Sequence, residues 1–112
     1  MPKRQRERRR HKRHELACPL SVGEQGGGVL ANSRSINISD GGMLFPVPAD
    51  ARPKRGASVR VEFSVPRATP NTFLLEGFSA EATVVRHEPA GGDAPARVAL
   101  AFQGPVDLAL EV

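Results

Sequence analysis

Alternation of apolar and polar residues is the main pattern along the chain, and it predicts β-strands. The clearest run covers residues 57–65, whose apolar positions are Val59, Val61, Phe63 and Val65. A period of two places one set of side chains on a core and the other set in solvent. The same alternation returns over residues 78–84 and 96–102. We therefore expect three half-buried strands in the second half of the chain.

The first half contains three further apolar segments, at residues 15–22, 29–38 and 43–47. Pro19 interrupts the first segment, which is typical of an edge strand or a strand with a bulge. A glycine-rich turn separates the first two segments, and prolines end the third. At the other end of the chain, residues 105–112 have room for at most a short helix, with its proline in the first turn.

Six short strands without a helix long enough for a crossover predict antiparallel pairing. A closed barrel protects the edges of such a sheet better than an open sandwich does. We therefore predict an all-β fold, a six-stranded antiparallel β-barrel over residues 15–112, preceded by a flexible arm at residues 1–14. A chain of 112 residues fits one domain with a modest core.

Positive charge is concentrated in the predicted arm. Eight of the 16 basic residues lie within the first 13 positions, where Glu7 is the one acidic residue. The remainder of the chain carries eight basic and eleven acidic residues, so the basic character belongs to the arm. The arm has no apolar periodicity and many like charges, which predicts a coil when it is free. Its electric field will attract phosphate groups.

Composition and motifs narrow the class of protein. A single cysteine excludes an internal disulfide, and no apolar run is long enough for a secretory signal or a membrane span. We therefore expect a cytoplasmic protein. The chain has no nucleophile elbow, Walker loop or zinc-protease motif, so we predict that it is not an enzyme and has no cofactor.

Two kinds of binding site are also disfavoured. A metal site would have to be assembled from His11, His14, Cys18 and His87, whose spacing matches no standard ligand cluster. All five aromatic residues are phenylalanines, and three of them fall on predicted core faces. A single-strand nucleic-acid binder would instead need exposed aromatic stacking platforms.

A polar segment between two apolar runs contains the residues Asn37, Ser39, Asp40, Gly41 and Gly42. Glycine permits positive φ angles, and Asn, Asp and Ser bond their own backbone, so the segment is typical of a tight turn. The same turn chemistry opens backbone N–H groups that can hold a phosphate. Turn chemistry alone leaves both interpretations open.

A second motif favours the binding interpretation. Arg9-x-x-x-Arg13 precedes the first strand, and Asn37-x-Ser39-x-x-Gly42 lies between the second and third apolar segments. This ordered pair resembles the PilZ domain, the bacterial receptor family for cyclic di-GMP, and the resemblance covers roughly residues 6–108. It implies a ligand-binding set made up of Arg8, Arg9, Arg10, Arg13, Asn37, Ser39, Asp40, Gly41 and Gly42.

The resemblance also implies roles for these residues. Arg9 and Arg13 would clamp phosphate and the Hoogsteen edge of guanine, which a bidentate guanidinium fits well. Asn37 would accept from the guanine N1 and N2 hydrogens, in place of the aspartate that is commoner in the family. Ser39 would bond phosphate or guanine, and the two glycines would let the backbone approach.

The arginine register has alternatives, because Arg4 with Arg8 and Arg6 with Arg10 share the spacing of Arg9 with Arg13. The last pair is preferred because it lies nearest the strand that anchors it. Arg8 would then be free to stack on a further guanine, so that a stacked pair of ligands binds. Arg34 and Arg86 are expected to be solvated charges on strand faces.

The predicted function is therefore a cyclic di-GMP receptor. Ligand would order the arm over the barrel and change the surface offered to an unidentified protein effector. Two alternatives remain open at this point. The chain could be a degenerate PilZ-like module that only binds proteins, or its basic arm could bind nucleic acid without sequence preference.

Overall fold

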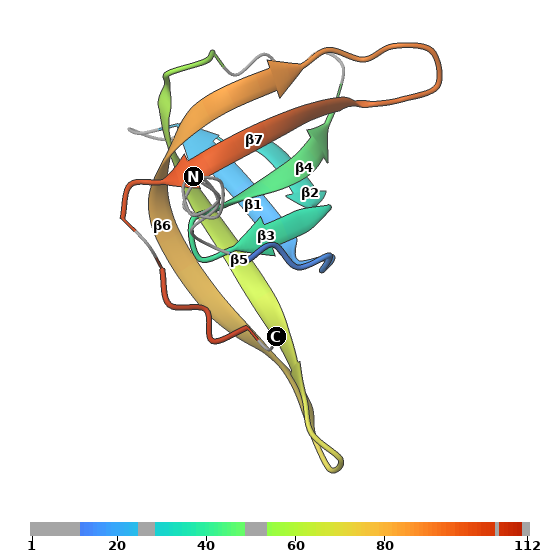
Figure 1. The fold of residues 1–112 in the computed structure, drawn as a ribbon, viewed down its shortest axis with the longest axis vertical. Helices are drawn as coiled ribbons and strands as arrows, with labels where there is room; N and C mark the ends of the chain where they lie inside the picture. Colours follow the sequence, from blue (N-terminus) through green and yellow to red (C-terminus); the bar gives the residue numbers. More distant parts are fainter. Residues whose placement is uncertain (1–11, 25–28, 49–53, 105, 111–112) are drawn as a thin grey trace, which may run out of the picture.

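Seven antiparallel strands in one curled sheet make up the fold (Figure 1). The computed structural model describes residues 12–24, 29–48, 54–104 and 106–110. The strands are β1 (Pro19–Glu24), β2 (Val29–Arg34), β3 (Asn37–Ser39), β4 (Gly42–Val47), β5 (Ser58–Ala68), β6 (Phe73–Glu88) and β7 (Ala96–Phe102). Their order across the sheet is β2-β1-β5-β6-β7-β4-β3. The all-β prediction is confirmed, and the described residues contain no helix.

The core lies on the inner face of the curl, where the predicted alternation places it. Buried and exposed residues alternate along β5, and every second residue of β7 is buried. Phe63 on β5 stacks between two neighbours, with ring centroids 5.5 Å from Phe78 and 5.8 Å from Phe102. Burial of large apolar side chains of this kind supplies about 1.5–3 kcal/mol each. The three rings thus join β5, β6 and β7.

The count of six strands was wrong, because the segment 29–38 forms two strands and not one. β2 ends at Arg34 and β3 begins at Asn37, and these two strands lie at opposite edges of the sheet. The chain turns at Ser35, which is 5% exposed. Its hydroxyl donates to the Leu16 carbonyl and accepts the Cys18 N–H at 2.8 Å. These bonds tie the corner to the segment that precedes β1.

The expected closure of the barrel is incomplete. No strand ladder joins β2 to β3 within the residues that the structure describes, so the sheet is a curled half-barrel. A side-chain bond instead joins β2 to β4, since the Ser33 hydroxyl donates to the Pro46 carbonyl at 2.5 Å. The three-residue length of β3 and the corner at Ser35 leave little backbone for a closing ladder.

β6 is longer than predicted and projects with β5 as a hairpin beyond the rest of the sheet (Figure 1). β6 pairs with β5 from Phe73 to Thr83, whereas its pairing with β7 begins only at Ala82. The projecting part carries three exposed apolar side chains, namely Phe73, Leu74 and Leu75.

Residues 106–110, named here the C-terminal strap, return across the sheet without regular structure. Leu108 is fully buried in the core, and Val106 and Leu110 pack against it while partly exposed. The helix considered for this end of the chain does not form at these positions. The strap instead covers the inner face of the sheet with its central leucine.

Candidate functional site

The polar segment singled out in the sequence is a β-hairpin that joins β3 to β4. Ser39 pairs with Gly42 at its end, and Asp40 and Gly41 form a two-residue turn. An Asp-Gly turn is among the favoured connections for hairpins of this length. Four of the predicted ligand-binding residues therefore lie at the end pair or in the turn itself, and Asn37 begins β3.

Ser39 is nearly buried, with 8% of its surface exposed. Its hydroxyl accepts the N–H of Gly41 at 3.1 Å, which is the local bond expected of a serine two residues before a turn amide. The bond fixes the hydroxyl and the Gly41 amide beside each other. A polar donor and acceptor are thus grouped at the tip of the hairpin.

The hairpin lies close to the end of β7. The Gly41 carbonyl accepts the Phe102 N–H at 2.9 Å. A Cβ atom added at Gly42 would lie 2.0 Å from the Leu100 carbonyl oxygen, well inside any allowed contact. Close backbone approach therefore requires glycine at position 42.

The N-terminal segment reaches this hairpin through a backbone bridge. His14 and Ile38 exchange two bonds, from the His14 N–H to the Ile38 carbonyl at 2.8 Å and from the Ile38 N–H to the His14 carbonyl at 2.9 Å. Ile38 stands between Asn37 and Ser39, and Arg13 directly precedes His14 and is exposed. Arg13, the second arginine of the first motif, thus lies near the hairpin motif at one edge of the sheet.

Arg8, Arg9 and Arg10 lie outside the described residues. The structure therefore brings together Arg13 and the hairpin residues Asn37, Ser39, Asp40, Gly41 and Gly42.

A family model described as PilZ domain matches residues 7–111. The chain belongs to the PilZ domain family. The match confirms the resemblance inferred from the arginine pair and the hairpin motif. No curated protein sequence matches the chain.

Two solved structures share the fold of this PilZ domain. One is the inhibitor of motility MotI/DgrA of Bacillus subtilis, with 17% identity, a TM-score of 0.71 and 88% of this chain covered. The chain spans only 44% of that protein. The other is the PilZ domain of YcgR from Escherichia coli with c-di-GMP, with 15% identity and a TM-score of 0.55. That comparison covers 87% of this chain and 79% of the other.

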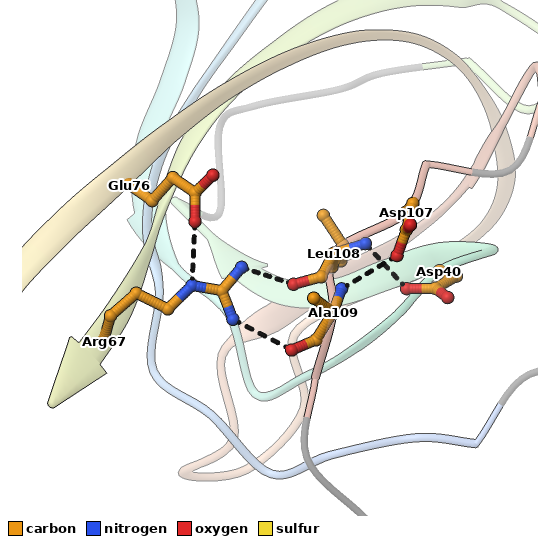
Figure 2. A network of polar contacts seen from close by, with 6 residues as sticks. All are labelled: Asp40, Arg67, Glu76, Asp107, Leu108 and Ala109. Carbon is orange, nitrogen blue, oxygen red and sulfur yellow. Dashed lines mark hydrogen bonds and ion pairs between the residues drawn. The ribbon is translucent and has the colours of Figure 1, made fainter. Parts of the chain in front are cut away.

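Asp40 of the PilZ domain has partners that sequence reasoning missed. Its backbone carbonyl accepts the Val106 N–H at 2.9 Å, and its Oδ1 accepts the Leu108 N–H at 3.1 Å. The turn of the hairpin is therefore bonded to the C-terminal strap (Figure 2). No local pattern in the sequence indicates a contact between positions so far apart.

Arg67 holds the strap from the other side (Figure 2). Its Nη1 donates to the Ala109 carbonyl at 3.0 Å, and its Nη2 donates to the Leu108 carbonyl. Its Nε donates to Glu76 Oε1 at 2.9 Å across the β5–β6 hairpin. Sequence reasoning missed this residue as well. Arg67 pairs with Leu74 in the strand ladder, and Glu76 is its diagonal neighbour on β6.

A further group of charged side chains in the PilZ domain is paired on the surface, around Glu88. Glu88 accepts from Arg97 Nη2 at 2.6 Å and from Arg86 Nε at 2.7 Å. These hydrogen bonds, Arg97 first and Arg86 second, hold the pKa of Glu88 below its ordinary value. Arg86 is thus engaged on the sheet surface, and Arg34 is exposed at the end of β2.

Cys18 and the described histidines do not form a metal-binding cluster. Cys18 is fully buried, and burial raises the pKa of its thiol. Among the described positions, no group of three or more His, Cys, Asp or Glu side chains could hold a metal ion. In the same part of the chain, no helix has the length and apolar character needed to cross a membrane.

Proposed function

We propose that this PilZ domain is a receptor for cyclic di-GMP, which binds at the β3–β4 hairpin. The observation that carries the proposal is the bridge between His14 and Ile38, which sets Arg13 beside the hairpin motif. Family membership supports it, as does the YcgR PilZ domain, whose structure was solved with c-di-GMP.

The ligand's chemistry suits the arginines of the N-terminal segment. Cyclic di-GMP carries two phosphodiester charges and two guanines, whose N7 and O6 atoms accept a bidentate guanidinium. Arg13 and Arg9 act as this clamp, since the guanidinium fork also stacks on the guanine face. Arg8 and Arg10 flank the clamp, and Arg8 stacks on a second ligand where two ligands bind as a stacked pair.

The hairpin supplies shorter polar groups at fixed positions. The Asn37 amide oxygen accepts from the guanine N1 and N2 hydrogens, and the Ser39 hydroxyl bonds phosphate or guanine. Gly41 carries no side chain, so the ligand can approach the backbone there, while Gly42 lets β4 lie against β7 and so holds the hairpin in place. Asp40 holds the turn that presents these groups, through its bonds to the strap.

Ligand binding is communicated to an effector by a change in the surface that the domain exposes. His14 is already bonded to the sheet edge, and ligand draws the part of the arm that precedes this bridge onto the sheet. The ordered arm with its ligand then forms a new face for a protein effector. The domain acts as a receptor and adaptor rather than as an enzyme.

Titration of cyclic di-GMP into the protein, with variants at Asn37, tests the proposal. Asn37→Asp should tighten binding several-fold, because a carboxylate makes a charge-assisted bond roughly twice as strong as that of an amide. Asn37→Ala should weaken binding about tenfold, because it leaves the guanine edge without an acceptor. Absence of binding by the unmodified protein would contradict the proposal. Equal affinities for all three proteins would place the ligand away from the hairpin.

A further inference from the structure

The C-terminal strap links two parts of the sheet that have no direct bond between them. At one end of the link, Asp40 accepts the Val106 and Leu108 N–H groups at 2.9 and 3.1 Å. At the other end, the Arg67 guanidinium donates to the Leu108 and Ala109 carbonyls. Figure 2 shows the bond from Leu108 to Asp40 and the two bonds from Arg67 reaching the strap from opposite sides. Leu108 is bonded in both directions.

The strap takes its shape from these contacts. Ala109 has a φ of 51°, a left-handed conformation that residues with a Cβ rarely adopt. The Ala109 N–H donates to Asp107 Oδ1 at 3.1 Å, and its carbonyl accepts from Arg67. A segment with no helical or strand hydrogen bonds would not keep this conformation unless its partners fixed it.

Arg67 itself is held in one orientation. Its side chain is 25% exposed, and its Nε is occupied by Glu76 at 2.9 Å. Because the guanidinium is planar and forked, fixing Nε aims the two Nη groups at the strap carbonyls. Arg67, the strap and Asp40 therefore form one continuous hydrogen-bonded unit that ends beside Ser39.

We propose that Arg67 is a positioning residue for the ligand site and acts through the strap. The docked strap fixes Asp40, and Asp40 fixes the turn that presents Ser39 and the Gly41 amide. This inference rests on the proposed function, because it concerns regulation of the same site. A ligand binds more tightly when the polar groups that it contacts are already held in their bound positions. We therefore expect ligand affinity to be higher when the strap is docked.

The coupling must act in both directions. If a docked strap raises ligand affinity by some factor, bound ligand stabilises the docked strap by the same factor. Ligand should therefore slow hydrogen exchange at the Val106 and Leu108 amides, which lie outside the ligand site. A partner protein that binds the strap would therefore change ligand affinity through the hydrogen-bonded unit of Arg67, the strap and Asp40.

The test compares Arg67→Gln with Arg60→Gln. Arg60 is an exposed arginine on the same strand, paired with Glu81 at 3.2 Å and without a bond to the strap, so it is a matched control. In ligand-free protein, Arg67→Gln should speed exchange at the Leu108 and Gly41 amides. It should also weaken cyclic di-GMP binding by roughly fivefold or more. The control should change neither quantity.

Glu76→Gln provides a milder variant in case Arg67→Gln does not fold. It removes the charge that orients Arg67, and it should move both exchange and affinity in the same direction by smaller factors. Rescue by Arg67→Lys should be partial, because lysine keeps the charge and loses the fork.

The outcomes separate the inference from the function on which it rests. If the unmodified protein does not bind cyclic di-GMP, both fail. If it binds, and Arg67→Gln loosens the strap while affinity stays the same or rises, only the inference fails. Unchanged exchange at Leu108 and Gly41 in Arg67→Gln would also overturn the inference, because the strap would not depend on Arg67.

Discussion

The glycine that begins β4 shows how one residue can serve both the fold and the site. The missing side chain at Gly42 lets β4 approach the backbone of β7, because an added Cβ would lie 2.0 Å from the Leu100 carbonyl oxygen. The sequence indicated glycine as a turn former at this position. It did not indicate the contact with β7, which depends on strand pairing between distant segments.

Replacing this glycine should destabilise the protein strongly. Gly42→Ala forces a backbone shift and should lower the free energy of unfolding by about 3 kcal/mol. Gly77→Ala is the control, because a Cβ at that strand position meets nothing within 4 Å and should change stability by less than about 0.5 kcal/mol. Urea denaturation measures both variants. Equal stabilities would contradict the close contact between β4 and β7.

The hydrogen bonds from Arg97 and Arg86 to Glu88 make the stability of the folded protein depend on pH. The pKa of Glu88 is lowered in the folded state, so its contribution to stability is present at neutral pH and is lost as pH falls through and below the carboxylate range. Glu88→Gln should therefore be less stable than the unmodified protein near neutral pH. The difference in denaturation midpoint should shrink at about pH 3. A difference that is constant with pH would contradict the assignment.

Among the elements, the strands with clear alternation were predictable and the corner at Ser35 was not. β5 and β7 follow the period-two pattern, so their buried faces could be named from the sequence. The segment 29–38 is also apolar enough for one strand. It breaks because the Ser35 hydroxyl bonds the backbone of residues 16 and 18, and those partners are set only by the folded chain.

The Ser35 hydroxyl bonds at this corner lead to a testable prediction about stability. Ser35→Ala would leave the buried Cys18 N–H and Leu16 carbonyl without their side-chain partner. The free energy of unfolding should fall by about 1–3 kcal/mol. Ser79→Ala, at an exposed position on β6, is the control and should have little effect. Chemical denaturation compares the two, and an unaffected Ser35→Ala would argue against the corner bonds.

The candidate site was predictable where it depends on short motifs and hidden where it depends on long-range contacts. Asn37, Ser39 and the two glycines follow one another closely, so their grouping was readable from the sequence. The strap and Arg67 approach this site from residues dozens of positions away. Such contacts are a property of sheet order, which single-sequence patterns do not specify.

In the molecule as a whole, the curl of the sheet joins the segment before β1 to β3, and so joins a basic region to a hairpin of polar groups. A receptor and a nonspecific charge tether differ in what they require of this region. A tether depends on the number of charges, so any one basic residue can be removed with little effect. A guanine clamp depends on the guanidinium fork at a particular position.

The most direct test of the central claim is an isothermal titration of cyclic di-GMP at near-physiological salt into the unmodified protein, Arg13→Ala and Lys12→Ala. Lys12 is the matched control, because it is the neighbouring exposed cation. We predict that Arg13→Ala weakens binding roughly tenfold or more, as expected for loss of a bidentate contact, and that Lys12→Ala has little effect. Equal, small losses in the two variants, or no binding by the unmodified protein, would contradict the account.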